Sequence, residues 1–373
     1  MEDKKVRVAI THGDTNGIGY ELIFKTFAEP EMLELCTPII YGSPKIAAYH
    51  RKALNMETNF SIINDAKEAK DNHVNLLTCF DEEVKVELGV PSQESGQAAL
   101  KALDRAMTDY RDEAYDVLAC APVNDCSLKV GTFEFTGTSS YVKTCIGNGY
   151  ENLNLLMNDS LRIAFLTDKI SLKEVAGAVN KESIVAKATL LAKTLKRDFS
   201  ISNPRIAVLA LNPDHSANQP GKEEAEHIIP AIEELKTRGV QAFGPYPAEQ
   251  LFGTGEYKTF DAVLVMYHDQ GAVPFKALSA EAGILYTAGL PLICTHPDLC
   301  ADFEHAGQGL ADASSFRQAI FKAIDLFRHR RAYDEAYANP LQKLYREKRD
   351  ESEKVRFSIP KKHENTIKET QKQ

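Results

Sequence analysis

A histidine and an aspartate stand together at the end of an apolar stretch, where they could hold a metal ion. Tyr267-His268-Asp269-Gln270-Gly271 directly follows Ala262–Met266, which has the composition of a buried strand. Open α/β sheets bind ligands at the carboxyl ends of their strands. A neutral imidazole there can ligate a divalent metal, and the neighbouring carboxylate can orient it or add a ligand. One such pair without spaced partners indicates a metal only weakly, and a histidine in a surface loop is the alternative.

A second candidate segment also ends an apolar stretch. It reads Leu211-Asn212-Pro213-Asp214-His215. Asp214 and His215 could be metal ligands. Because Asn-Pro-Asp is also common turn chemistry, the residues alone leave both interpretations open.

Two polar loops could bind an anion. The glycine-rich segment Gly13–Gly19 lies between an expected strand and helix, where free N–H groups suit a phosphate. Its spacing is not that of the dinucleotide-binding fingerprint, and a tight turn that needs glycine is the simpler explanation. The Phe135–Ser140 segment offers hydroxyls, which suit a phosphate or a solvated loop. No signature of an activated serine surrounds Ser139 or Ser140, so we exclude serine hydrolysis.

The elements that position these residues alternate between short apolar strands and amphipathic helices. The expected strands are Val6–Ile10, Pro38–Tyr41, Asn75–Leu77, Val117–Ala121, Arg162–Leu166, Arg205–Leu211 and Ala262–Met266. The expected helices are Glu21–Phe27, Ser43–Leu54, Ser95–Arg111, Lys181–Arg197, Glu223–Arg238 and Ser315–Arg328. This alternation predicts an α/β fold with crossover connections and a largely parallel sheet, covered by helices on both sides.

The composition narrows the class of protein. A chain of 373 residues suggests two domains. The net charge of -9 argues against a nucleic-acid partner, but one local basic pocket would suffice for an anionic small substrate. The seven cysteines are odd in number, show no Cys-x-x-Cys spacing and include Cys120 inside an apolar stretch. With no apolar stretch near the start and none long enough to span a bilayer, we expect a cytoplasmic protein with reduced thiols and no membrane contact.

An ordered set of segments resembles the 4-hydroxythreonine-4-phosphate dehydrogenase family of vitamin B6 biosynthesis. The matches run from Val6 to about Leu326 and are more specific together than any single motif. They comprise Ile10–Asp14, Gly17–Gly19, Ser95–Ala99, Ala121–Asn124, Leu211–Pro213, Gly244–Ala248, Tyr267–Gly271, Gly289–Pro291 and Ala306–Gly309.

The resemblance implies a fold and a reaction. The fold would be two α/β/α domains around a cleft, as in isocitrate and isopropylmalate dehydrogenases, assembled as a homodimer. We expect residues 1–135 with 310–348 in the first domain, residues 136–309 in the second, and a flexible polar tail at 349–373. The reaction would be oxidation of a phosphorylated hydroxy amino acid by NAD (or NADP), followed by loss of CO₂. A divalent metal such as Zn, Mg, Mn or Co would lower the pKa of the substrate hydroxyl.

The family's metal ligands carry over only in part. The family uses three histidines, and His268 matches one of them. The second position falls at Lys169, beside Asp168, and the third at Asp214, with His215 one residue later. An ammonium repels a metal unless its pKa is strongly lowered. The predicted metal site therefore consists of His268, His215, Asp214 and Asp168.

The family's substrate residues are also altered. Its Gly-His-Thr-Glu segment is Gly137-Thr138-Ser139-Ser140 here, and a family lysine is replaced by Asp125. A family asparagine falls at Leu285 and a family arginine at Cys294. A thiol cannot replace the bidentate phosphate contact of an arginine.

The predicted substrate-binding residues are therefore Thr138, Ser139 and Lys276, the last of which is kept from the family. We expect Lys276 and Asp269 to act in catalysis. The sequence does not indicate which residues bind the cofactor.

Three functions remain open at this stage. The first is the family reaction with a rebuilt metal site. The second is a dehydrogenase for another, less anionic hydroxy acid, because Cys294 and Leu285 make that wall apolar. The third is a non-catalytic binding or regulatory protein on the same scaffold.

Overall fold

The computed structural model describes residues 5–80, 84–124, 129–130, 133–134, 137–146, 149–213, 221–279 and 283–339. Asp125, Asp214, His215 and the expected tail at 349–373 lie outside these residues. No helix within the described ranges is long and apolar enough to cross a membrane.

Twelve of the described strands form one sheet, in the order β11-β10-β12-β9-β8-β13-β14-β5-β1-β2-β4-β3. In chain order these strands are β1 (Val6–Thr11), β2 (Cys36–Gly42), β3 (Ser61–Ile63), β4 (Asn75–Thr78), β5 (Val117–Cys120), β8 (Leu153–Met157), β9 (Arg162–Phe165), β10 (Arg205–Leu209), β11 (Gln241–Tyr246), β12 (Ala262–Val265), β13 (Ile284–Ala288) and β14 (Ile293–Pro297). A separate pair is formed by β6 (Lys129–Val130) and β7 (Phe133–Glu134).

The sheet consists of two parallel groups joined by antiparallel strands. We call β11, β10, β12 and β9 the β9 half, and β14, β5, β1, β2, β4 and β3 the β5 half. Between them, β9–β8, β8–β13 and β13–β14 are antiparallel pairs. Because three reversals separate the halves, their strands run in opposite directions. The expectation of an α/β fold is confirmed. The alternation of strands and helices did not, however, predict the antiparallel centre.

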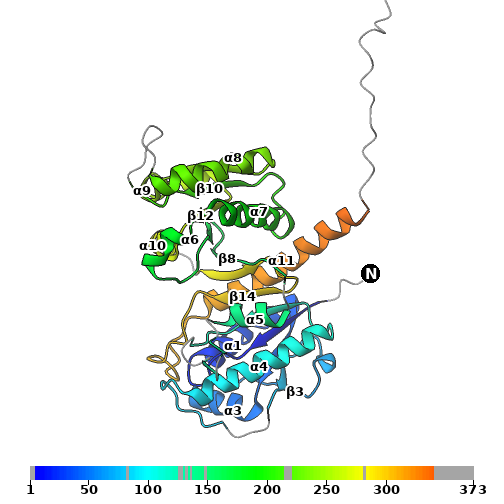
Figure 1. Cartoon of the computed structure of the whole chain (residues 1–373). Helices are drawn as coiled ribbons and strands as arrows, with labels where there is room; N and C mark the ends of the chain where they lie inside the picture. Colours follow the sequence, from blue (N-terminus) through cyan, green and yellow to red (C-terminus); the bar gives the residue numbers. More distant parts are fainter. Residues whose placement is uncertain are drawn as a thin grey trace, which may run out of the picture.

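Helices cover both faces of the sheet. They are α1 (Gly19–Phe27), α2 (Glu31–Leu35), α3 (Pro44–Ala53), α4 (Gln93–Arg111), α5 (Thr138–Ile146), α6 (Leu172–Ala178), α7 (Lys181–Arg197), α8 (Ile229–Thr237), α9 (Ala248–Gly253), α10 (His268–Leu278) and α11 (Ser314–Ala338). Short 3-10 turns lie at Ala66–Glu68 and Glu256–Thr259, and a π-helical turn at Glu224–Ile228 precedes α8. In Figure 1, α3 and α4 lie in the lower part of the molecule with the β5 half, and α7 and α8 lie in the upper part.

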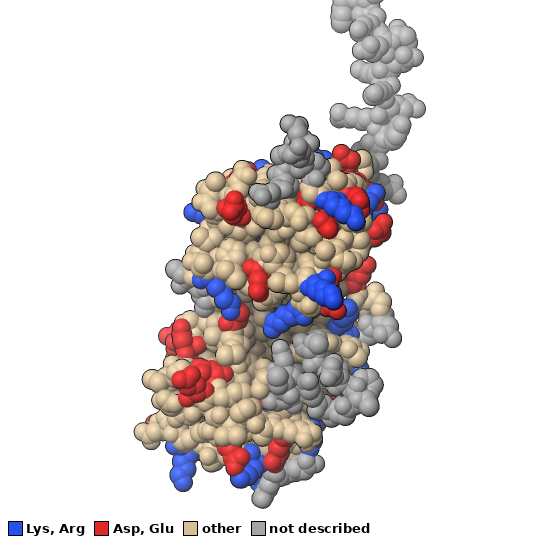
Figure 2. All heavy atoms as spheres, turned by 60° about the vertical axis from the view of Figure 1, so that its left-hand side comes forward, with Lys and Arg blue, Asp and Glu red and all other residues tan. Residues whose placement is uncertain are grey.

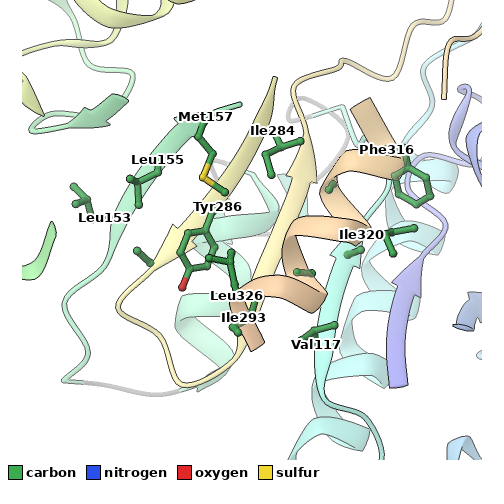
Figure 3. Close-up of a cluster of buried hydrophobic side chains, with 14 of the residues drawn as sticks. Val117, Leu153, Leu155, Met157, Ile284, Tyr286, Ile293, Phe316, Ile320 and Leu326 are labelled. Atoms are coloured by element: carbon green, nitrogen blue, oxygen red, sulfur yellow. The ribbon is translucent and has the colours of Figure 1, made fainter. Parts of the chain in front are cut away.

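The long helix α11 packs along the centre of the sheet. It contacts β14 and β5 of the β5 half, β13 of the antiparallel centre and helix α7, so it fastens the β5 half to the centre of the sheet. Phe316 and Ile320 are fully buried, and Figure 3 shows Leu326 of α11 next to Tyr286 and Ile293. Burying a side chain of this size contributes about 1.5–3 kcal/mol. The domain boundaries drawn from the sequence stay a prediction, since β14 lies within the expected second domain and pairs with β5 of the first.

A buried ion pair reinforces this junction. Arg330 of α11 donates to both carboxylate oxygens of Asp198 at 2.8 and 3.0 Å, and to the Tyr286 hydroxyl at 2.8 Å. The Tyr286 hydroxyl itself donates to Asp198 at 2.7 Å. Burial and the negative charge of Asp198 raise the pKa of Tyr286 well above its usual value, so the phenol stays protonated. The network ties the end of α7 to β13 and α11.

Candidate functional site

A strip of polar side chains crosses the middle of the sheet, on the face covered by α5. We call Asp168, Asn154, Thr287, Ser139 and His296 the polar strip. Asn154 donates its amide to Asp168 at 3.0 Å and accepts the Thr287 hydroxyl at 3.3 Å. The Ser139 hydroxyl lies 2.9 Å from Thr287 Oγ1 and 3.1 Å from His296 Nε2. The strip therefore connects the end of β9 with β14.

Strand register explains why these residues meet. Asn154 on β8 lies opposite Thr287 on β13. Extending the β13–β14 register past Tyr286 and Thr295 brings Thr287 level with Cys294. Residues directly opposite on neighbouring strands point to the same face. The polar strip is thus a direct consequence of the antiparallel centre.

Thr138 and Ser139 begin helix α5. The expected hydroxyl cluster therefore lies in the first turn of a helix, where backbone N–H groups are free to meet an anion. Ser139 is partly buried and belongs to the polar strip, as described above. The structure thus brings one predicted substrate residue, Ser139, into one network with one predicted metal ligand, Asp168.

His268 begins helix α10, at the carboxyl end of β12. Its Nδ1 lies 2.8 Å from the Asp269 carboxylate, and its ring stacks on Phe165 with centroids 5.4 Å apart. This arrangement leaves Nε2 as the nitrogen offered to a ligand. Asp269 is well placed to orient the ring, which is one of the two roles beside a metal that the sequence allowed. The expectation that it acts in catalysis stays a prediction.

Asp168 and His268 lie at one edge of the sheet because β9 and β12 are neighbours. Val265 pairs with Phe165, and the Leu166 N–H donates to the Val265 carbonyl at 2.9 Å. Strand β10, which leads to residues 214 and 215, is the other neighbour of β12. Of the predicted metal ligands, His268 and Asp168 therefore come from two adjacent strand ends. Among the described residues alone, His268 and Asp168 form no group of three with another His, Cys, Asp or Glu.

Two buried polar residues hold these strand ends, and no local sequence pattern signals either role. Gln270 accepts the Met266 N–H at 2.8 Å and donates to the Ala210 carbonyl at 2.7 Å. Glu224 accepts the N–H groups of Leu211 and Asn212 at 2.7 and 2.9 Å. Burial alone would raise the pKa of Glu224, but hydrogen bonds from Asn212 and the backbone outweigh burial and lower it.

Lys276 lies near the other end of α10. Its Nζ is 3.3 Å from a carboxylate oxygen of Asp298, directly after β14, and its side chain is 62% exposed. The ammonium therefore lies at the end of the strand that carries His296. Lys169, the position of a family histidine, is exposed.

Two cysteines stand beside His296 that sequence reasoning did not assign to the site together. The ligand atoms of Cys120, Cys294 and His296 all lie within 4.8 Å of one another. Both cysteines are fully buried. Cys120 was expected only as a buried thiol, and Cys294 as an altered substrate position. The pairing of β5 with β14 would have indicated that Cys120 and Cys294 lie close together, but β14 was not predicted from the sequence.

On the face shown in Figure 2, lysine and arginine side chains are interspersed with acidic side chains from the top to the bottom of the molecule. This mixed distribution gives no broad basic surface on that face, in keeping with the net charge of -9. A phosphorylated small molecule needs only a local basic contact.

The chain is similar to known proteins over most of its length. Residues 34–323 match the family described as pyridoxal phosphate biosynthetic protein PdxA. The 4-hydroxythreonine-4-phosphate dehydrogenase of Bacteroides thetaiotaomicron is 50% identical over 359 residues, 96% of this chain and 98% of that protein. The D-threonate 4-phosphate dehydrogenase of Cupriavidus necator is 32% identical over 87% of this chain and 98% of its own. The crystal structure of 4-hydroxythreonine-4-phosphate dehydrogenase from Klebsiella pneumoniae superposes with a TM-score of 0.75 at 26% identity, over 88% of this chain and 99% of that one.

Proposed function

Because this chain belongs to the PdxA family of pyridoxal phosphate biosynthetic proteins, we propose that it is a dehydrogenase that oxidises 4-hydroxythreonine 4-phosphate with NAD. The observation that carries the proposal is the 50% identity over nearly the full length of both chains. A non-catalytic role is disfavoured, since an identity this extensive links the chain to a curated dehydrogenase.

The geometry supports a division of roles within the site. The hydroxyls of Thr138 and Ser139 and the first-turn N–H groups of α5 would bind the phosphate. Lys276 would contact a substrate carboxylate or carry a proton. Its partner Asp298 at 3.3 Å holds the ammonium near the end of β14.

The residues at the β9 and β12 ends fit a divalent metal. An imidazole nitrogen of His268 and a carboxylate of Asp168 are ligand types that such an ion accepts. Asp214 and His215, which follow β10 in the chain, would complete the set. A bound metal would polarise the substrate hydroxyl, and NAD would accept the hydride. Asp269 would hold the His268 ring in place.

A second substrate is favoured by a specific observation. Relatives at 32% identity are named D-threonate 4-phosphate dehydrogenases. We therefore include D-threonate 4-phosphate as the alternative substrate. We also retain the homodimer and the cytoplasmic location as proposals.

The test is NADH formation by the purified chain with each substrate in turn, with and without added divalent metal. We expect metal-dependent turnover with 4-hydroxythreonine 4-phosphate. Turnover with D-threonate 4-phosphate alone would assign the second substrate. Absence of turnover with both, at high enzyme concentration and with the fold verified, would overturn the dehydrogenase proposal. Sedimentation analysis of the same sample tests the dimer.

A further inference from the structure

His296, at one end of the polar strip, forms with the two cysteines beside it a group that has the composition of a zinc site. We propose that Cys120, Cys294 and His296 bind one thiophilic divalent cation, Zn²⁺ in the first place, at a site separate from the one predicted around His268. Thiolate sulfur and imidazole nitrogen are the ligands that zinc prefers, and a Cys₂His set with one further position is a common arrangement. The inference does not depend on the proposed substrate.

The sheet itself brings the ligands together. On the parallel pair β5–β14, Cys294 lies level with Leu118 and Thr295 with Ala119. One step further, His296 is level with Cys120. Alternate residues of a strand share a face, so Cys120, Cys294 and His296 all point to the same side. Their backbone positions are therefore set by two hydrogen-bonded strands rather than by a mobile loop.

The separations agree with tetrahedral coordination. Zinc binds sulfur at about 2.3 Å and nitrogen at about 2.0–2.1 Å, so tetrahedral ligands of these two types lie roughly 3.6 Å apart. The observed distance between Cys294 Sγ and His296 Nε2 is 3.6 Å. The Ser139 hydroxyl, 3.1 Å from the same nitrogen, marks the side where a fourth ligand would stand, either this hydroxyl or a water.

Charge and burial also favour a cation here. The two cysteines are fully buried and His296 is partly buried, so the fourth position faces the more open side. Two thiolates and a neutral imidazole would cancel the charge of Zn²⁺, which avoids burying a net charge. Binding releases both thiol protons to solvent.

Cobalt provides a direct optical test. The full chain is reduced, stripped of metal with a chelator and titrated with Co²⁺. We expect a thiolate-to-cobalt charge-transfer band that saturates at one equivalent and disappears when Zn²⁺ is added. Cys120→Ser and Cys294→Ser should each lose most of the band. Cys36→Ser, which changes another buried free cysteine, should keep it.

The His268→Ala variant separates this site from the predicted catalytic metal. It should lose dehydrogenase activity and keep the band. In the wild-type chain, activity without a band would overturn the zinc proposal and leave the proposed function standing, whereas a band without activity would overturn the proposed function and leave the zinc proposal standing. A band undiminished in both serine variants would also overturn the zinc proposal.

X-ray absorption at the zinc edge reads the wild-type chain without any substitution. With one equivalent of Zn²⁺ we expect a sulfur shell at about 2.3 Å. A shell of nitrogen and oxygen only would contradict the assignment. Detection by peptide mapping of a Cys120–Cys294 disulfide in the presence of Zn²⁺ would also contradict the assignment.

Discussion

The two halves of the sheet carry different chemistry where their strands end. In the β5 half, Cys120 and Cys294 are fully buried and are placed by strand register. In the β9 half, the His268 side chain is 38% exposed and that of Asp269 74% exposed, at the start of a helix. Neutral thiols tolerate burial, whereas carboxylates keep their charge most cheaply in water. One sheet thus places soft thiol groups in its interior and a histidine–carboxylate pair at an exposed edge.

The largest expected effect comes from the junction between the halves. Arg330→Met should lower the free energy of unfolding by about 3–5 kcal/mol, because Asp198 would remain buried and unpaired. Urea denaturation, followed by circular dichroism and by cysteine reactivity, measures the loss. The matched control is Arg331→Met, which removes an exposed pair with Glu335 and should cost less than about 1 kcal/mol. Two separate transitions in the variant would show that the halves unfold independently.

His268→Ala should remove a predicted metal ligand at the end of the β9 half and leave the cysteine group of the β5 half unchanged. We expect kcat/KM to fall by about 10³-fold, or roughly 4 kcal/mol, since a metal ligand is removed. Steady-state NADH kinetics measure the change. His227→Ala, on the π-helical turn, is the control and should leave kcat/KM within about twofold. A fall of less than about tenfold for His268→Ala would remove this residue from the metal site.

Glu224→Gln should destabilise the segment that follows β10, where Glu224 accepts the N–H groups of Leu211 and Asn212. Losing a charged acceptor for two N–H groups costs about 1–3 kcal/mol. Because the folded-state pKa is lowered, the contribution is complete above the ordinary value of 4.5 and disappears as pH falls through the folded pKa. Urea titrations of both chains across this range should converge at low pH. The exposed Glu226→Gln serves as control, and a constant difference at every pH would contradict the charge-based explanation.

The smallest expected effect is that of Ser139→Ala, which tests the contact between the two regions. We expect KM for the phosphorylated substrate to rise about tenfold, roughly 1.4 kcal/mol, with kcat nearly unchanged. Initial-rate measurements at several substrate concentrations separate the two constants. Ser140→Ala, one residue along α5, should change neither. A drop confined to kcat would place Ser139 in the chemical step rather than in phosphate binding.

Much of the scaffold was predictable from local patterns. The expected segments at Val117–Ala121 and Lys181–Arg197 correspond to β5 and α7, and the other expected strands and helices are also found. His268 was correctly expected to lie at a strand end. By contrast, β8, β13 and β14 were not predicted, since each is a short apolar stretch that no amphipathic helix follows directly. Without these strands, Asn154, Thr287 and His296 had no reason to be grouped.

Residue types and spacing alone determined the α/β class, the family and the place of His268, because strand and helix periodicity are local properties of the chain. Only the tertiary structure decided that Cys120 meets Cys294 and His296, and that Asp168 reaches Ser139 through Asn154 and Thr287. These contacts depend on which strands become neighbours and in what register. A shift of one residue turns a side chain to the opposite face, so no local pattern can specify them.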